Sequence, residues 1–452
     1  MVQEEIFKGE WSLPGSSASF TGTLTFDPLN GTKLELLGSL NHLWGPRSHK
    51  IILGKTTNGW ITLYDTHYES GSSSNETGAV ISVYKPMMIF CGYHFENVDD
   101  LKFSSVSFHV FNLLEWLNID GLTERRNVPD YLFDYKRPDS ITFNCNEGCE
   151  AEIEFSLNGK YLNDYYNIVY DQSCKVTFRY NTRKSYNEIL SDIFIFIGFV
   201  TLCTYEQSYP KKIVFFDDEI IDEFIQDRLK TTVPKPIECI YRNSFYSPNY
   251  KIRKWHQHLI RYDNISSQFA SIMPKWFSKS KELEQVIKLL LLSFVNKYEF
   301  NTEKFMDAIR ALETFHRLNH SNEVIDKGDF DRRIERIVVS ARLLPVEEEW
   351  LKSKLEFTNE PSLLERLYEM VNAYSFKYFK ERVPDSNIFC RQAKNSRNYY
   401  THFNKALAGK ALKGKELFDI TENLKLLLFS AVFINIGISS DSYDQSVRML
   451  VY

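Results

Sequence analysis

The sequence predicts an α+β protein, with an antiparallel β-rich N-terminal domain followed by a helical bundle. Short runs of alternating apolar and polar residues fill the chain up to about residue 180, which is typical of half-buried strands. Two prolines in segment 233–237 indicate a junction. Beyond about residue 250 the apolar spacing becomes helical. We therefore predict a β-rich domain at 1–235, a linker with connecting helices at 236–280, and a helical domain at 281–452.

The expected strands are recognised by alternation and by turn residues between them. Residues 20–26 alternate, and the turn-forming segment 27–31 separates them from the next run at 33–37. Tyr and Phe, which favour strands, are abundant, with 26 and 34 copies. The remaining expected strands lie near 51–54, 60–64, 79–84, 104–110, 151–156, 174–180 and 212–216. One helix is expected at 186–197, and the domain should be a sandwich or a barrel.

The helical half shows start signals. Asn301 can cap a helix whose apolar residues Phe305, Ile309 and Leu312 share one face. Further helices are expected from residue 360, from Asp385, and over 415–436. These elements predict a bundle.

Composition restricts the class of protein. The 452 residues are 43% hydrophobic and 25% charged, as in a globular protein of two or three domains. Seven irregularly spaced cysteines are typical of a reduced, cytoplasmic protein. The acidic N-terminal segment does not resemble a signal peptide. The longest apolar run, 193–203, is shorter than the roughly 20 residues that span a bilayer. We expect no membrane association.

Segment 395–402 carries the residues most suited to chemistry, Arg397, Asn398 and His402. Residues 391–415 contain no Asp or Glu, although the whole chain has a formal charge of −5. A cationic segment on an acidic protein is a candidate surface for a polyanion. The candidate RNA-binding residues in this segment are Arg391, Lys394, Lys405, Lys410, Lys413 and Lys415.

Arginine and histidine together suffice for RNA cleavage through the ribose 2′-hydroxyl. Histidine can accept the hydroxyl proton near neutral pH, and arginine can stabilise the charge that develops on the phosphate. On one straight helix, however, five residues rotate by roughly 500°, so Arg397 and His402 would diverge by about 140°. Arg397 therefore either lies at a helix start or joins its site across a subunit interface.

The motif and its surroundings resemble the HEPN ribonucleases, and most closely their ApeA-like members from bacterial anti-phage defence. The resemblance rests on Arg-Asn-x-x-x-His, on the following Ala-Leu-Ala-Gly-Lys-Ala-Leu-Lys-Gly-Lys-Glu-Leu, and on the apolar helix ending at Gly437. Near the N-terminus, Gly9-Glu-Trp-Ser-Leu-Pro14, Gly22-Thr-Leu-Thr-Phe26 and Leu34-Glu-Leu-Leu-Gly38 are similar to that family's first domain.

The resemblance implies a metal-independent endoribonuclease that restricts phage by cutting cellular RNA, with tRNA as a target by analogy. It implies a homodimer in which two motif copies face one cleft. Glu313, on an early helix, would orient Arg397. The β-domain would be a sensor or regulator, and a phage-encoded protein is a candidate trigger.

Other functions stay open. The basic segment could bind RNA or a protein without cleaving RNA, or the Arg397–His402 motif could be only a dimer contact. Glu313, His316 and His320 share a helical face, but neither a zinc-protease motif nor a second Glu-x-x-His is present, so no metal is expected. Cys145 and Cys149, even with Cys174, lack an evident fourth zinc ligand. Cofactor-binding motifs are absent, so no cofactor is expected.

Overall fold

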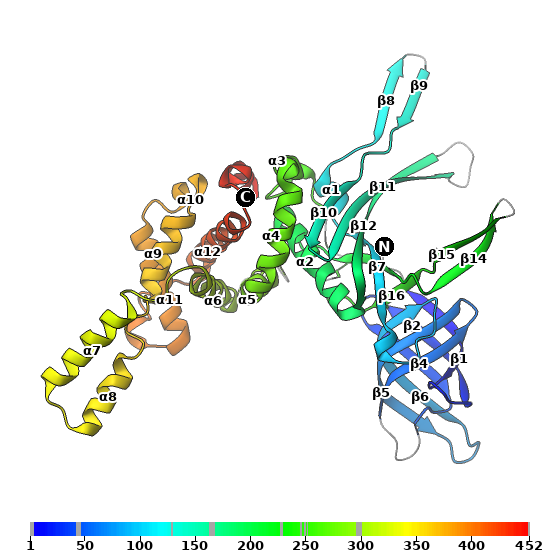
Figure 1. Ribbon diagram of the computed structural model, residues 1–452, viewed down its shortest axis with the longest axis horizontal. Coiled ribbons are helices and arrows are strands. Elements are labelled where there is room, and N and C mark those ends of the chain that lie inside the picture. The colour runs from blue at the N-terminus through cyan, green and yellow to red at the C-terminus, as the bar shows by residue number, and fades with distance from the viewer. Residues whose placement is uncertain are drawn as a thin grey trace. The chain divides into compact units, whose positions relative to one another are not determined.

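The computed structural model describes residues 4–41, 47–127, 130–161, 168–226, 229–244, 246, 247, 250, 252–294 and 301–450. The chain forms two compact units, Met1–Phe277 and Ser278–Tyr452. The first is built around a β-sheet and the second is helical (Figure 1). The predicted α+β class is therefore confirmed.

The strands of the first unit form one large antiparallel sheet and two separate hairpins. In order across the large sheet, the strands are β10 (Ile141–Asn146), β11 (Cys149–Tyr161), β12 (Ile168–Ser185), β7 (Lys102–Val110), β13 (Pro210–Phe216), β16 (Ile237–Tyr241), β6 (Val80–Cys91), β3 (Gly31–Leu37), β2 (Ser19–Asp27), β1 (Glu5–Ser12), β4 (Ser48–Thr56) and β5 (Gly59–Ser73). The hairpins are β8 (Leu122–Asn127) with β9 (Asp130–Tyr135), and β14 (Ile221–Gln226) with β15 (Leu229–Pro234).

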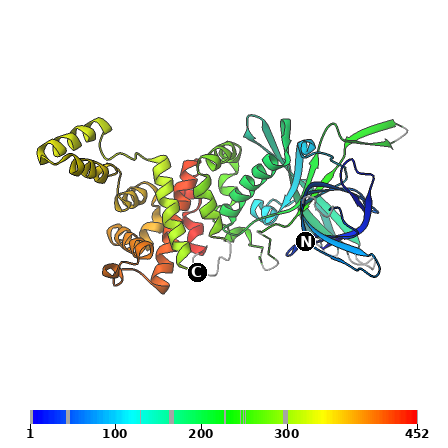
Figure 2. The same cartoon turned by 90° about the horizontal axis from the view of Figure 1, so that it is seen from below.

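Six of these strands close into a barrel, because β5 pairs with β6 as well as with β4. Figure 2 shows the barrel strands as a ring. Its interior holds buried apolar side chains, among them Trp11 and Tyr84. A Cβ at Gly54 would lie 2.3 Å from the Trp11 ring, so that position requires glycine. The alternation in the sequence thus leads to a barrel that continues into an open sheet.

Helix α2 (Tyr186–Thr204) packs on the open part of the sheet. Ser185 caps it, and Glu188 completes the capping box. Phe196 contacts the rings of Phe108, Phe143 and Phe178. This is the described helix that is long and apolar enough to cross a membrane, yet 67% of its most apolar 18-residue window is buried in the structure, as in a core helix.

The first unit extends to Phe277, beyond the predicted boundary at residue 235. The start of the segment that was predicted as a linker with connecting helices is a strand of the sheet, because β16 pairs with β13 and β6. The short elements that follow are α3 (Tyr262–Ile265) and the start of α4 (Phe269–Glu282). The Trp276 indole N–H donates to the carbonyl of Ile195 at 2.8 Å, which fastens α4 to α2.

The second unit is a bundle in which α6 and α9 contact each other and each contacts both α11 and α12. Its helices are α5 (Glu284–Leu292), α6 (Thr302–Asn319), α7 (Lys327–Ala341), α8 (Pro345–Leu355), α9 (Leu363–Tyr374), α10 (Lys377–Arg382), α11 (Ser386–His402), α12 (Gly414–Asn435) and α13 (Asp444–Leu450). Asn301 and Asp385 cap α6 and α11 as predicted, each accepting a backbone N–H.

Candidate active site

The motif residues lie on one continuous helix, α11. Arg397 is in its second half and His402 is its last residue, so the expectation that Arg397 begins a helix is wrong. Five residues of regular helix separate their directions by about 140°. Among the described residues, no hydrogen bond or ion pair joins Arg397 to His402. The remaining alternative, in which the two act together across a subunit interface, stays a prediction.

Arg397 is held by an acidic neighbour. A guanidinium nitrogen lies 3.6 Å from Oε2 of Glu313, which α6 carries. A second nitrogen donates to Oδ1 of Asn398 at 3.3 Å. The Arg397 side chain remains 30% exposed and that of Glu313 22% exposed. The structure thus places Glu313 where it can orient the guanidinium while leaving part of that group open to a ligand.

His402 is exposed at the C-terminus of α11. The next residue, Phe403, adopts a left-handed conformation with φ of 48°, which ends the helix. In the part of the chain that the structure describes, the imidazole has no hydrogen-bond or ion-pair partner. Both ring nitrogens are therefore free to contact a substrate.

The end of the basic segment 391–415 is hydrogen-bonded to α11, the helix that carries the motif. The backbone of Leu412 bonds α11 twice: its N–H donates to the hydroxyl of Ser396 at 3.0 Å, and its carbonyl accepts from Tyr400 at 2.8 Å. The loop after α11 is thereby fixed beside the helix that carries Arg397.

The predicted RNA-binding cations are available in this arrangement. Lys394 is half-buried and the other five are exposed, and within the described chain none has an ion-pair partner. Unpaired cations beside the motif helix suit a phosphate chain. The full set is Arg391, Lys394, Lys405, Lys410, Lys413 and Lys415.

Comparison with known families agrees with this architecture. Residues 6–276 match the family described as ApeA N-terminal domain 1, and residues 306–442 match the one described as Apea-like HEPN. The chain belongs to the ApeA-like HEPN family. Its N-terminal family match covers the barrel and open sheet, and the HEPN match includes Glu313, Arg397 and His402. The family is a defence-related, nuclease-like one. No curated protein and no solved structure matches the chain.

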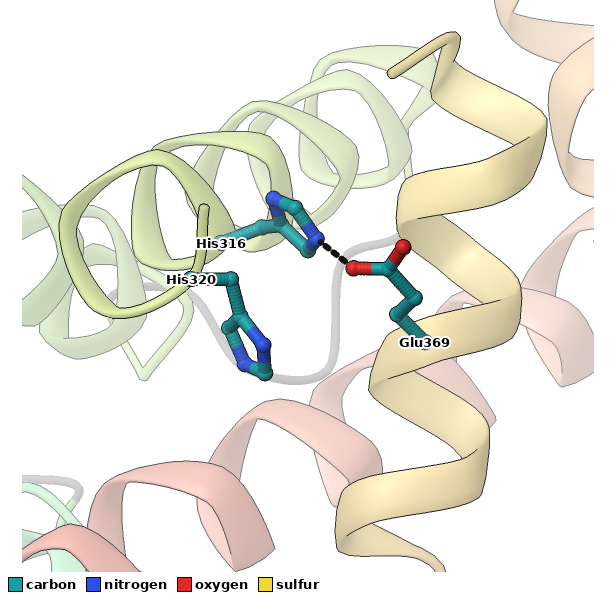
Figure 3. Close-up of side chains that lie close together, drawn as sticks. All are labelled: His316, His320 and Glu369. Carbon is teal, nitrogen blue, oxygen red and sulfur yellow. Dashed lines mark hydrogen bonds and ion pairs between the residues drawn. The ribbon is translucent and has the colours of Figure 1, made fainter. Parts of the chain in front are cut away.

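A second cluster of polar side chains in this ApeA-like protein joins α6 to α9. Figure 3 shows His316 directed at Glu369, with His320 beside His316. Nε2 of His316 lies 2.6 Å from Oε2 of Glu369, and the two imidazole rings stack with centroids 4.6 Å apart. The nearest ligand atoms of the three residues all lie within 4.8 Å of one another, which is a spacing that a metal ion could draw together.

The hydrogen-bond partner of Nδ1, the second ring nitrogen of His316, argues against metal binding. Nη1 of Arg366 lies 2.9 Å from Nδ1, and because arginine can only donate, Nδ1 is an acceptor. A neutral ring must then carry its proton on Nε2, which donates to Glu369 and has no lone pair for a metal. The guanidinium charge beside the ring also disfavours a cation. Burial lowers the pKa of His316, so the neutral form is favoured.

Sequence reasoning missed Arg366 and Glu369. Arg366 is 2% exposed and also donates to the carbonyl of Pro361, to Asn322 at 2.8 Å and to Glu360 at 3.2 Å. The feature of the sequence that could have identified Arg366 is its place at an apolar position of α9, beside Leu367 and Met370. Its partners come from separate segments, so the pattern alone could not identify them.

The cysteines do not form one cluster. Cys145 and Cys149 lie together on β10 and β11, whereas Cys174 pairs with Phe155, six residues along β11 from Cys149. Burial raises the pKa of the Cys174 thiol to about 12 and that of Cys145 still further. Because Cys174 lies apart from Cys145 and Cys149, the geometry favours ordinary thiols.

Proposed function

We propose that this ApeA-like protein is a metal-independent endoribonuclease of anti-phage defence. The observation that carries the proposal is the contact between Glu313 and Arg397, which presents a partly open guanidinium on the helix that ends in an exposed His402. The unpaired cations of the adjoining loop support a polyanionic substrate. Asn398, bonded to Arg397, helps to set the position of that side chain.

In the proposed reaction, His402 takes the proton of a ribose 2′-hydroxyl, and the 2′-oxygen forms a bond to the adjacent phosphorus. The P–O bond to the next nucleotide's 5′-oxygen breaks, and that oxygen takes a proton from the imidazolium of a second His402 or from water. Arg397 stabilises the added charge on the phosphate oxygens. The products are a 2′,3′-cyclic phosphate and a 5′-hydroxyl.

A homodimer would resolve the divergence of Arg397 and His402 along α11. Two chains related by a two-fold axis could direct the arginine of one and the histidine of the other at the same phosphate. The substrate would be cellular RNA in the cytoplasm, with tRNA as the first class to test. The barrel unit would regulate the nuclease, and a phage-encoded protein would relieve that control.

Cleavage is expected to persist in EDTA, because the proposed base and cation are protein side chains. Purified protein should cut RNA at the same rate with and without chelator, and the 3′ ends should resist ligation until the cyclic phosphate is opened. Loss of cutting in EDTA with recovery in magnesium would remove this mechanism. If the protein binds RNA but never cleaves it, even in the presence of a phage-encoded trigger protein, the non-catalytic alternative would be favoured.

A further inference from the structure

An aromatic residue occupies the position that ends the motif helix. Phe403 follows His402 directly and adopts a left-handed conformation with φ of 48°. Glycine or asparagine is usual at this position after a helix, because a positive φ is unfavourable for other residues and most of all for bulky ones. The Phe403 side chain is also 70% exposed, so it buries little apolar surface that could offset the strain. The fold alone therefore gives no reason for an aromatic side chain here.

A second ring lies beside that of Phe403. Tyr399, one turn earlier on α11, is half-buried, and its ring meets the Phe403 ring edge-on with centroids 5.9 Å apart. Tyr400 differs, because its hydroxyl donates to the carbonyl of Leu412 and its ring contacts Phe305 of α6. We call Phe403 and Tyr399 the aromatic pair. Tyr399 supports the Phe403 ring from the side and leaves most of it open.

The aromatic pair lies on the His402 side of α11. Counting 100° per residue, Tyr399 is about 60° from His402 around the helix axis but about 160° from Arg397. Phe403 is the neighbour of His402 in the chain. A nucleotide whose ribose contacts the His402 imidazole would therefore have its base within reach of the aromatic pair.

The charges around the aromatic pair favour a nucleic acid as its ligand. Segment 391–415, which contains the pair, has no Asp or Glu. Lys405, two residues after Phe403, is exposed and has no ion-pair partner within the described chain. Exposed rings between cations are typical of sites for unpaired nucleotides, in which the ring stacks on the base and the cations contact phosphates. An apolar protein surface would leave these cations without partners.

We propose that Phe403, supported by Tyr399, stacks on an unpaired base of the RNA next to the phosphate that is cut. The inference rests on the proposed nuclease function and specifies its substrate. The cut must lie in a single-stranded loop or end, because a base paired within a duplex does not expose its face to a side-chain ring. Phe403 then holds the nucleotide so that its 2′-hydroxyl faces His402, and takes no part in proton transfer.

The test measures stacking directly and does not depend on cleavage. The full His402→Ala chain is titrated into a single-stranded RNA that carries 2-aminopurine, whose fluorescence is quenched when it stacks on an aromatic ring. Adding Phe403→Gly should remove most of the quenching and weaken binding by about tenfold, whereas Phe403→Trp should retain both. Glycine suits a positive φ, so the glycine variant should fold at least as stably, which circular dichroism checks.

The matched control is Phe357→Gly, which removes a ring 68% exposed on the loop after α8 and should leave quenching and binding unchanged. If Phe403→Gly leaves both unchanged, the stacking proposal is overturned while the proposed nuclease function stands. A changed sedimentation coefficient for Phe403→Gly with unchanged RNA binding would assign the ring to a subunit contact and overturn the proposal equally. Absence of RNA binding by every one of these chains would remove the stacking and the proposed function together.

Discussion

Replacing Arg397 by alanine is expected to slow RNA cleavage by about 10²–10³-fold, the loss typical when one donor to a developing oxyanion is removed. Glu313 and Asn398 hold this guanidinium in place, so the alanine variant loses a donor whose position is fixed by two neighbours. RNA binding should fall far less, since six other cations remain. The measurement is single-turnover cleavage with a parallel binding titration.

The matched control for Arg397 is Arg391→Ala. Arg391 lies on the same helix and carries the same charge, but it is exposed and without an ion-pair partner in the described structure. Its loss should weaken binding slightly and leave the cleavage rate of bound RNA nearly unchanged. Equal losses from the two variants would mean that Arg397 contributes only to general charge attraction.

Replacing Arg366 by methionine should destabilise the helical unit by about 3 kcal/mol, because it leaves buried acceptors without a donor. The guanidinium bonds His316, Asn322, Glu360 and the carbonyl of Pro361, and thereby joins α9 to the end of α6. Methionine fills a similar volume but donates nothing. Hydrogen exchange of peptides from α6 and α9 measures the effect within this unit.

Arg317 offers a control that shares the same carboxylate. It lies 2.9 Å from Oε2 of Glu360, but its side chain is 49% exposed, against 2% for Arg366. Exposed ion pairs contribute at most about 1 kcal/mol. Arg317→Met should therefore change hydrogen exchange only slightly. A similar increase in exchange for both variants would show that the buried hydrogen bonds of Arg366 contribute little.

The parts of the fold that depend on local chemistry could be predicted from the sequence. Asn301 and Asp385 cap helices because their side chains bond backbone N–H groups three residues ahead, which needs no distant partner. Barrel closure could not be predicted, because it depends on the pairing of β5 with β6. The first unit extends past the predicted boundary at residue 235, because β16 follows the two prolines and pairs with strands that are far away in the sequence.

The candidate site was predictable in its residues and not in its geometry. The Arg-x4-His spacing and the acid-free segment identify Arg397, His402 and the cations. That Glu313 approaches Arg397 follows from the packing of α6 on α11, which no local pattern determines. Arg366 was missed because a buried arginine depends on partners from several segments. The hairpin of α7 and α8 was missed because its apolar residues are largely exposed.

Sequencing of RNA ends from cells that express the wild-type chain or His402→Ala tests the central claim most directly. His402 has no described partner in the chain, so alanine should remove the base without disturbing the fold. The wild-type chain, once activated, should produce new 5′-hydroxyl ends paired with 2′,3′-cyclic phosphates at defined positions, and these ends should be absent with His402→Ala. The same cuts at the same frequency in both samples would contradict the assignment of His402 as the base.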